Sequence, residues 1–305
     1  MKFISEEESA ALISHEMAFH AAREALIAVV DDAVIFPAVL AHGSSPTNRF
    51  SIKSASTSSF AGLKIGSFWP SNPERGLPRH NSLILLFDQS TGRVEWVIEA
   101  GKVNAFRTAA ADALAANTLA RKDASVLTIF GAGNQALYEC VAISRIRPIQ
   151  RVLVVARDKG RGNDFIQALH KEGLQAVQAE AQDACMQADI VVAATPARAP
   201  LFSVDWIRPG THVASMGSDA AGKQELPPEL FERAALFCDH PAQAVVMGDL
   251  QHFGGDRARI VALGDVLLDR IDGRTSPDQI TVFDSSGIAL QDLTIARSLI
   301  AAKQA

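Results

Sequence analysis

A glycine-rich turn is the first stretch of the sequence whose residues could do chemistry. The apolar run Val126–Phe130 breaks into Gly131-x-Gly133-x-x-Ala136 and continues in a helical pattern. The first glycine permits a tight turn, the second lets the backbone approach a pyrophosphate, and the helix N-terminus offers free N–H groups to phosphate. Because the turn follows a strand-like run and opens a helix, it has the context that this mechanism requires. The stretch therefore predicts a dinucleotide site.

The end of the next strand-like run, "RVLVVAR", bears on the choice between NAD and NADP. An NAD site usually carries Asp or Glu there for the ribose 2'-hydroxyl, whereas this run ends in Ala156-Arg157, with Lys159 and Arg161 close behind. An arginine attracts the 2'-phosphate that a carboxylate repels. NADP(H) is therefore favoured, and NAD(H) stays an alternative because Asp158 follows directly.

Three charged residues are candidates for substrate chemistry. Lys64 interrupts the strand-like run "AGLKIGSFW", and a lysine beside a cofactor can have its pKa lowered enough to exchange a proton with a substrate. Arg107 is expected in the first turn of a helix, where a cation opposes the helix dipole, so an anionic partner such as a substrate carboxylate would explain it. Asp219 follows "HVASMG" at the end of an expected strand. There it could hold an amine, relay protons, or cap the turn at Gly217-Ser218.

The N-terminal part of the chain is expected to form one helix and a meandering sheet. Ser5 with Glu8 forms a capping-box pattern ahead of a helix of roughly 20 residues that fades near Asp31. Four strand-like runs follow, "FSIKSAS", "AGLKIGSFW", "NSLILLFD" and "RVEWVIEA", and Asn104 is the expected N-cap of an Ala-rich helix. Because this lobe has too few helices to cover both faces of its sheet, we expect one face to be buried against a second copy in a homodimer.

From Val126 onward, strand-like and helical runs alternate as they do in a parallel sheet with crossovers. The last run, "SSGIALQDLTIARSLIAAK", has the pattern of an amphipathic helix with no strand after it, so we expect it to return to the first lobe. We predict an α/β protein in which a Rossmann-like dinucleotide-binding domain, residues 116–285, is inserted in an α+β substrate-binding and dimerisation domain, residues 1–115 and 286–305.

The composition argues against several other classes of protein. The 305 residues carry a formal net charge of −5 with scattered Lys and Arg, so no basic stripe points to nucleic acid. The acidic N-terminus and the lack of any apolar stretch of roughly 18 residues argue against a signal peptide and a membrane span, so we expect a cytoplasmic protein. The three cysteines are far apart and form no C-x-x-C pair, so neither a disulfide framework nor a metal site is expected.

Five stretches make the chain resemble the ornithine cyclodeaminase and mu-crystallin family across nearly its whole length. They are "LKIGSFWPSNPERGLPRHNSLILLFD", "FRTAAADALAANTLAR", "GAGNQA", "MGSDAAGKQEL" and "ITVFDSSGIALQDL". The resemblance implies a substrate and dimerisation lobe closed by the C-terminal helix, a Rossmann lobe and a nicotinamide cofactor. The family includes ornithine cyclodeaminases, ketimine and iminosuccinate reductases, alanine dehydrogenases and hormone-binding crystallins. It therefore indicates fold and cofactor class better than reaction.

The resemblance also implies roles for single residues. Lys64 would be the proton donor to an imine or a hydrogen-bond donor to the substrate carboxylate. Arg107 would grip that carboxylate, and Asp219 would be a second catalytic residue. His80 and Ser82 would face the nicotinamide half. The expected cofactor-binding residues are Ser82, Thr108, Gly131, Ala132, Gly133, Asn134, Gln135, Arg157, Thr195, Met216 and Gly217, and the expected substrate-binding residues are Arg107, Arg49, Lys53 and His80.

The chain departs from the cyclodeaminases in its expected substrate lining. Those enzymes carry an arginine where Ala38 stands and a glutamate, for the side-chain ammonium, in the segment that here reads "FSIKSAS". No Asp or Glu occurs from Ala33 to Pro73, but Arg49, Lys53 and Lys64 do. Because a buried second ammonium needs a carboxylate, ornithine fits poorly, and the positive lining suits an imino acid or an imino dicarboxylate. Arg49 and Lys53 resemble the iminosuccinate reductase branch, unless they face solvent.

These observations predict an NAD(P)H-dependent reductase that delivers hydride to C2 of a small imine carboxylate, with iminosuccinate to aspartate as the most specific hypothesis. Three alternatives stay open. An ornithine cyclodeaminase would show no net change in nicotinamide absorbance. An alanine dehydrogenase would reduce pyruvate in the presence of ammonia, and a crystallin-like binding protein would hold NADPH without turnover.

Overall fold

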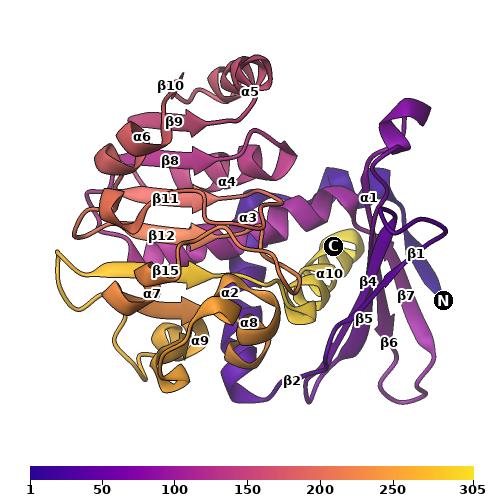
Figure 1. The fold of residues 1–305 in the computed structure, drawn as a ribbon. Coiled ribbons are helices and arrows are strands. Elements are labelled where there is room, and N and C mark those ends of the chain that lie inside the picture. Colours follow the sequence, from indigo (N-terminus) through magenta and orange to yellow (C-terminus); the bar gives the residue numbers. More distant parts are fainter. The chain divides into compact units, whose positions relative to one another are not determined.

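Two units make up the chain in the computed structural model, which describes residues 1–305 (Figure 1). Unit 1 comprises Met1–Arg107 and Ile288–Ala305, and unit 2 comprises Thr108–Gly287. The sequence placed these divisions after residues 115 and 285. Helix α3 (Gly101–Leu119) runs through the first division, so no loop marks it. Unit 2 is an insertion in the chain of unit 1.

Unit 1 contains a seven-stranded sheet in the order β1-β7-β6-β5-β4-β2, with β3 also beside β4. Strand β1 runs parallel to β7 and all other neighbours are antiparallel, as the predicted meander requires. The strands are β1 (Lys2–Ile4), β2 (Val34–Ile35), β3 (Val39–His42), β4 (Arg49–Ser56), β5 (Ala61–Phe68), β6 (His80–Phe87) and β7 (Val94–Glu99), with a 3-10 turn η1 (Asn72–Arg75) before β6.

Helices α1 (Glu6–Leu12) and α2 (His15–Asp31) take the place of the single N-terminal helix that the sequence predicted. The capping box is confirmed, because the side chains of Ser5 and Glu8 each accept a hydrogen bond from the other's backbone N–H. The single helix was wrong, because the chain is extended at the junction and Ser14 caps a second helix.

Helix α3 begins earlier than predicted, at Gly101 rather than after Asn104. The carboxylate of Glu6 accepts hydrogen bonds from the backbone N–H groups of Gly101 and Lys102, at 2.7 and 2.8 Å, and so caps the helix from a distant part of the sequence. Asn104 is therefore an internal helix residue and not the N-cap. Arg107 lies in the second turn rather than the first, where the helix dipole acts on it more weakly.

Helix α10 (Ala289–Gln304) packs against α2 and strands β4, β5 and β6 of unit 1. Its residues from Ala289 to Ala296 are all buried, so the first two turns are not amphipathic as predicted. This buried stretch includes Gln291 and Asp292. Because a buried polar side chain normally has a partner, these two residues point to a polar site inside unit 1.

The two faces of the unit 1 sheet have different surroundings. A Cβ added to Gly62 would lie 2.9 Å from the side chain of Leu293, so α10 packs closely on the face that we call the inner face. On the opposite, outer face, the cross-strand neighbours Ile52, Ile65 and Leu83 are only half-buried. No element of unit 1 therefore fully covers the outer face.

Unit 2 holds an eight-stranded, all-parallel sheet in the order β10-β9-β8-β11-β12-β15-β13-β14. Its strands are β8 (Val126–Phe130), β9 (Arg151–Val155), β10 (Ala176–Gln178), β11 (Ile190–Ala193), β12 (His212–Ser215), β13 (Ala234–Cys238), β14 (Ile260–Ala262) and β15 (Ile280–Asp284). Its helices are α4 (Asn134–Ser144), α5 (Lys159–Lys171), α6 (Ala181–Gln187), α7 (Glu229–Arg233), α8 (Pro241–Met247) and α9 (Leu263–Leu267), with 3-10 turns η2 (Val204–Trp206), η3 (Asp249–His252) and η4 (Arg257–Arg259).

The strand order of unit 2 reverses between β8 and β11, since the chain proceeds outward from β8 through β9 to β10 and then returns to β11 and β12 on the other side (Figure 1). In such sheets the ligand binds outside the carboxyl ends of the strands at this switch point. The Rossmann-like prediction is confirmed, and the loops after β8, β9, β11 and β12 are the ones to inspect.

The core of unit 2 is apolar, and it contains the three cysteines of the chain. All four residues of β11 are buried, as expected for a strand whose sheet is covered on both faces. Cys140, Cys185 and Cys238 are free thiols and are buried. Across the chain, no helix combines the length and the apolar character needed to cross a membrane.

Candidate functional site

A pair of lysines lies on the inner face of the unit 1 sheet. Lys53 of β4 is the direct cross-strand partner of Lys64 of β5, and Lys64 is only 7% exposed. Like charges directly opposite one another destabilise a sheet, so this pair needs anions nearby. Arg49 lies on the same face of β4 as Lys53, by the alternation of strand side chains, and it is exposed. The inner face is therefore rich in positive charge.

The ammonium of Lys64 belongs to a set of four side chains that we call the cation cluster, namely Lys64 of β5, Asn104 and Arg107 of α3, and Asp292 of α10. Oδ1 of Asp292 lies 3.0 Å from Nζ of Lys64 and 3.2 Å from Nε of Arg107. Oδ1 of Asn104 accepts hydrogen bonds from both cations, with 2.8 Å to Nη2 of Arg107. Gln291 accepts a further hydrogen bond from Nη1 of Arg107 at 3.0 Å. Two cations thus share one carboxylate and one amide oxygen.

The pKa of Lys64 is lowered from an ordinary value of 10.5 to about 7. Burial is the largest cause, the charge of Arg107 acts in the same direction, and Lys53 adds a smaller effect. Asp292 opposes these effects through its charge and its hydrogen bond. A lysine with a pKa near neutrality exists in both protonation states at physiological pH, so it can donate or accept a proton.

His80 and Ser82 lie on the same inner face, in β6. His80 is the cross-strand partner of Phe68, whose other partner is Arg49, and the His80 and Phe68 ring centroids are 4.7 Å apart. His80 is exposed and Ser82 is half-buried. Unit 1 therefore gathers on one sheet face all the residues that the sequence proposed from β4, β5 and β6.

Asp219 belongs to unit 2 and is engaged in a loop contact. Its Oδ1 lies 2.5 Å from Nζ of Lys223, and the Asp219 side chain is 58% exposed. Lys223 also donates a hydrogen bond to the carbonyl of Gly217 at 2.9 Å. The pair fixes the loop after β12. Both the catalytic role of Asp219 and the alternative, a cap on the turn at Gly217-Ser218, stay predictions.

The glycine loop after β8 has the geometry that a dinucleotide needs. Gly131 has a φ of 112°, and a Cβ there would lie 2.8 Å from the carbonyl oxygen of Ala194. Gly133 is the extended N-cap of α4, and a Cβ there would meet nothing within 4 Å, so its backbone is open to a ligand. The helix N-terminus at Asn134 then offers free N–H groups to a pyrophosphate, so these residues fit the cofactor.

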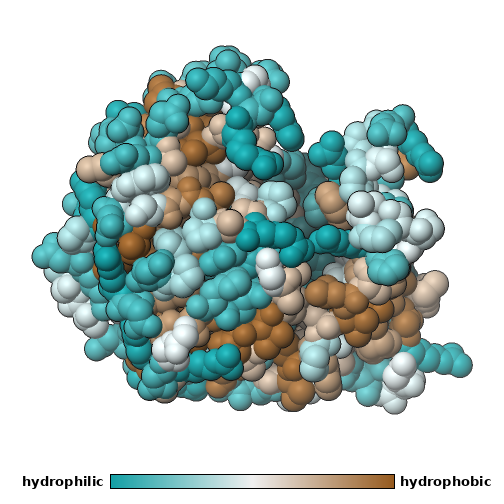
Figure 2. Space-filling model, viewed as in Figure 1, coloured by the Kyte–Doolittle hydropathy of each residue, from teal (hydrophilic) through white to brown (hydrophobic).

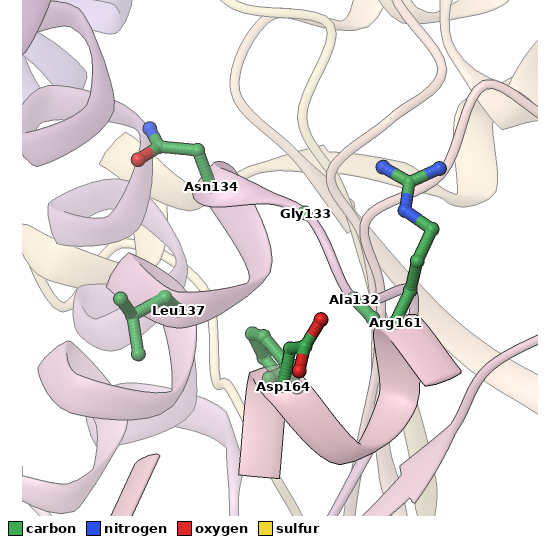
Figure 3. A pocket seen from close by; sticks show the side chains of 7 residues that line it. Ala132, Gly133, Asn134, Leu137, Arg161 and Asp164 are labelled. Carbon is green, nitrogen blue, oxygen red and sulfur yellow. The ribbon is translucent and has the colours of Figure 1, made fainter. Parts of the chain in front are cut away.

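A cavity of about 280 Å³ adjoins this loop and is lined by residues of α4 and α5. Figure 3 shows Asn134 and Leu137 on α4, Arg161 and Asp164 on α5, and Ala132 and Gly133 in the loop that leads into α4. The remaining lining residue is Phe165. A cavity beside a glycine loop, lined by both polar and apolar residues, is where part of a dinucleotide would lie.

Arg157 follows β9 and is exposed, and no carboxylate ends that strand. Asp158, the alternative partner for a ribose hydroxyl, is the N-cap of α5, and its Oδ1 accepts a hydrogen bond from N of Arg161 at 2.7 Å. One of its oxygens is therefore already used in capping. Arg157 and Arg161 leave this end of the site positively charged.

Buried Glu225 connects the loops that follow β11 and β12. Its Oε1 accepts hydrogen bonds from N and Oγ1 of Thr195, at 2.6 and 2.8 Å. Its Oε2 accepts hydrogen bonds from N of Gly217 at 2.8 Å and from Oγ of Ser215 at 3.0 Å. Burial and the nearby charge of Asp249 raise the pKa of Glu225 to about 7. This carboxyl group therefore positions two of the predicted cofactor residues, Thr195 and Gly217.

The other predicted cofactor residues occupy nearby elements of unit 2. Met216 directly follows β12 and is buried, Thr108 is half-buried in α3, and the amide of Gln135 in α4 donates a hydrogen bond to Glu139 at 2.7 Å. The role of these three residues in cofactor binding stays a prediction.

Sequence reasoning missed Asp292, Gln291 and Glu225. All three are fully or almost fully buried polar residues. Asp292 lies in the mostly apolar stretch "IALQDLTIA", and Glu225 ends "AAGKQE" just before an apolar residue. An isolated acid in an apolar stretch is a usable signal, because burial of an unpaired charge is expensive. Asn104 was noticed as a helix cap, and its contacts with both cations were not predicted.

Comparison with known proteins gives a consistent result over the whole chain. Residues 34–303 match the ornithine cyclodeaminase/mu-crystallin family. An iminosuccinate reductase of Paracoccus denitrificans is 32% identical over 307 residues, covering 98% of this chain and 96% of that protein. The crystal structure of that organism's iminosuccinate reductase with NAD+ superposes with a TM-score of 0.93, at 31% identity, and covers 100% of this chain and 96% of the other.

Two further solved structures are similar over the full chain. An archaeal alanine dehydrogenase dimer with bound NAD has a TM-score of 0.92 at 30% identity, and the match covers 100% of this chain and 96% of the other. A Δ1-pyrroline-2-carboxylate reductase of Thermococcus litoralis, in complex with NADH and L-proline, has a TM-score of 0.92 at 26% identity, with 100% and 98% coverage.

Proposed function

The chain belongs to the ornithine cyclodeaminase/mu-crystallin family, and we propose that within this family it is an NAD(P)H-dependent reductase that converts a small imine carboxylate into an amino acid. The observation that carries this proposal is the cation cluster. Arg107 supplies a guanidinium for a substrate carboxylate, and Lys64 supplies an acid whose pKa is close to neutrality. A carboxylate and a basic nitrogen are the two polar groups of an imino acid.

The residues of unit 1 have distinct tasks in this reaction. Arg107 binds and orients the substrate carboxylate, and Lys64 holds the proton that the imine nitrogen acquires. The nicotinamide, when bound, supplies the hydride for C2 of the imine. The inner face of the sheet keeps Lys64 away from bulk water, which favours reduction of the imine over its hydrolysis.

We propose that the side chain of the substrate carries a second carboxylate, as in iminosuccinate. Lys53 lies directly opposite Lys64, and within unit 1 the only carboxylate in ion-pair contact with Lys64 or Arg107 is Asp292, which contacts both. An anion is therefore favoured beside Lys53. The diamino acid of a cyclodeaminase reaction would bring a further cation to this face, which is unfavourable.

We further propose that the cofactor site of unit 2 prefers NADP(H) to NAD(H). Arg157 stands where an NAD site usually carries a carboxylate, and Asp158 is engaged in capping α5. Similar proteins are known with NAD or NADH bound. The preference proposed for this chain therefore rests on its own residues at the end of β9.

We also propose that two copies of the chain associate through the outer face of the unit 1 sheet. Partly exposed apolar side chains occupy this face, and Val39 of the neighbouring β3, the cross-strand partner of Ile52, is 54% exposed. Figure 2 shows hydrophobic residues at the surface over β4 and β5. A self-complementary apolar face of this kind suits a two-fold dimer, and light scattering at micromolar concentration would reveal a monomer if the proposal is wrong.

A direct assay tests the proposed reaction. Oxidation of NADPH and NADH is followed with oxaloacetate plus ammonia as a source of iminosuccinate, with Δ1-pyrroline-2-carboxylate, and with pyruvate plus ammonia. We expect the fastest rate with iminosuccinate and NADPH. Conversion of ornithine to proline and ammonia without net oxidation of cofactor would instead identify a cyclodeaminase, and tight NADPH binding with no turnover would identify a binding protein.

A further inference from the structure

Asp292 is the acid on which the cation cluster depends. It lies in the first turn of α10 and is 2% exposed, and it brings one oxygen, Oδ1, to both Lys64 and Arg107. Its second oxygen, Oδ2, is buried and accepts no hydrogen bond. Two cations face this buried carboxylate and offset the cost of burying its charge.

The charged groups around Lys64 come from three directions. Lys53 approaches from β4, Arg107 from α3 and Asp292 from α10, while Asn104 contributes an uncharged oxygen. Of the three charged neighbours, two are cations that disfavour a protonated Lys64, and Asp292 is the single group that favours it. Burial also disfavours the charged lysine.

We propose that Asp292 is a positioning residue that keeps Lys64 protonated and directed for donation to the imine nitrogen, an inference that rests on the proposed reductase function. In the reaction, hydride from the reduced nicotinamide forms the new C2–H bond, and the π electrons of the C=N bond form a new N–H bond with the proton of Lys64. The N–H bond of the lysine breaks, and Nζ is left as a neutral amine. The imine is reduced and the cofactor is oxidised by two electrons.

The same geometry explains why proton loss from Lys64 is tolerated inside the protein. Before donation, Lys64, Arg107 and Asp292 carry a combined charge of +1, counted as two cations and one carboxylate. After donation, Arg107 and Asp292 still form a neutral pair through the contact of 3.2 Å. Neither state leaves a buried carboxylate without a cation, which would be strongly unfavourable.

The test compares wild-type protein with Asp292→Asn and with a control, Glu24→Gln. Glu24 also pairs with α10, through Arg297 at 3.0 Å, but this pair is exposed and lies outside the cluster. Removing an opposite charge this close lowers the pKa of a lysine by about 1 unit or more. Because Lys64 must be charged to donate, the alkaline fall in kcat of Asp292→Asn should move to lower pH. Relative to wild type, kcat should drop roughly tenfold at pH 8 and hardly at pH 5.

A second readout does not depend on turnover. Competitive acetylation of Lys64 across pH, measured by mass spectrometry against the exposed Lys2, gives the pKa of Lys64 directly. We expect a lower pKa in Asp292→Asn and an unchanged one in Glu24→Gln. An unchanged Lys64 pKa in Asp292→Asn overturns the inference, even if kcat falls at all pH values. A lowered pKa in a protein that reduces no imine supports the action of Asp292 on Lys64 and refutes the proposed reaction.

A variant with the opposite expected effect on the pKa of Lys64 tests the inference if Asp292→Asn does not fold. Arg107→Gln removes the competing cation and leaves Asp292 to Lys64 alone, so the labelling pKa of Lys64 should rise above its wild-type value. A pKa that stays the same or falls in Arg107→Gln shows that the charges of the cation cluster do not control the protonation of Lys64, and this overturns the inference.

Discussion

Glu225→Ala should loosen two loops of unit 2 at once. The Glu225 carboxyl group is fully buried and accepts hydrogen bonds from the backbone N–H groups of Thr195 and Gly217. Each N–H left without a partner costs about 1 to 3 kcal/mol, so the alanine variant should lose about 2 to 6 kcal/mol of folding stability. Glu225→Gln retains one acceptor oxygen but turns an N–H donor toward one of the two loops. The loss of folding stability in Glu225→Gln should therefore be about half of the loss in Glu225→Ala.

The assay combines thermal or urea unfolding with titration of NADPH by fluorescence. If the loops after β11 and β12 bind the cofactor, the alanine variant should also weaken its Kd by about tenfold, because binding must then reorder them. Glu232→Gln is the control, since Glu232 belongs to the same unit but forms an exposed pair with Arg259 at 3.0 Å. Stability loss no greater than in the control would refute the hydrogen-bond argument. A large stability loss with an unchanged Kd would show that these loops do not bind the cofactor.

The pH dependence of folding stability provides a further check on Glu225, because the direction of the effect can be worked out in advance. Burial and Asp249 raise the pKa of Glu225 in the folded chain to about 7, above its ordinary value of 4.5. A raised pKa means that the stabilising contribution is complete below pH 4.5 and is lost as the pH rises through 7. The free energy of unfolding of the wild-type protein should therefore contain a contribution that decreases as the pH rises from 4.5 to 7. This decrease should be absent from Glu225→Gln. Oγ of Ser215 lies 3.0 Å from the carboxyl group of Glu225 and 2.5 Å from that of Asp249. The single hydroxyl hydrogen cannot be donated to both groups, so one of the two acids is expected to carry a proton. This agrees with a raised pKa for Glu225.

Three further predictions follow from the proposed function. Lys64→Ala and Arg107→Ala should each lower kcat by about 10²-fold while NADPH still binds, and a smaller effect measured in single turnovers would argue against their roles. Arg157→Asp should shift the ratio of NADPH to NADH affinity by about 1 to 3 kcal/mol toward NADH, whereas an unchanged ratio would mean that this arginine points to solvent. Lys53→Ala or Arg49→Ala should raise KM for an imino dicarboxylate and leave KM for Δ1-pyrroline-2-carboxylate nearly unchanged, and equal changes for both substrates would contradict a second carboxylate site.

Much of the fold could be predicted because its signals are local. The alternation of β4 to β7, the capping box at Ser5 and Glu8, and the strand, glycine turn and helix around Gly131 each depend on neighbouring residues. The start of α3 could not be predicted in this way. Glu6 caps that helix from a distant part of the chain, so a helix that appeared to need Asn104 as its cap begins at Gly101 instead.

The residues of the site could be predicted only in part, for a similar reason. Lys64 and Arg107 are conspicuous because each places a charge in an apolar context. Their common partner Asp292 lies in a helix that was expected to be amphipathic, where a single acid suggests a solvent-exposed position. Only tertiary packing reveals that this part of α10 is buried on all sides.

The position of the cation cluster in the chain connects its chemistry with the assembly of unit 1. Arg107 is the last residue of the first segment of this unit, and Gln291 and Asp292 stand near the start of the second, which begins at Ile288. The two segments therefore meet at the hydrogen bond and ion pair that Arg107 makes with α10. Before α10 docks, Lys64 and Arg107 have no acid between them, and their mutual repulsion opposes close approach. Docking of α10 supplies that acid, so the contact that closes unit 1 also completes the proposed proton donor. A substitution at Asp292 should consequently lower stability and activity together, and only the protonation state of Lys64 distinguishes a role in catalysis from a role in folding.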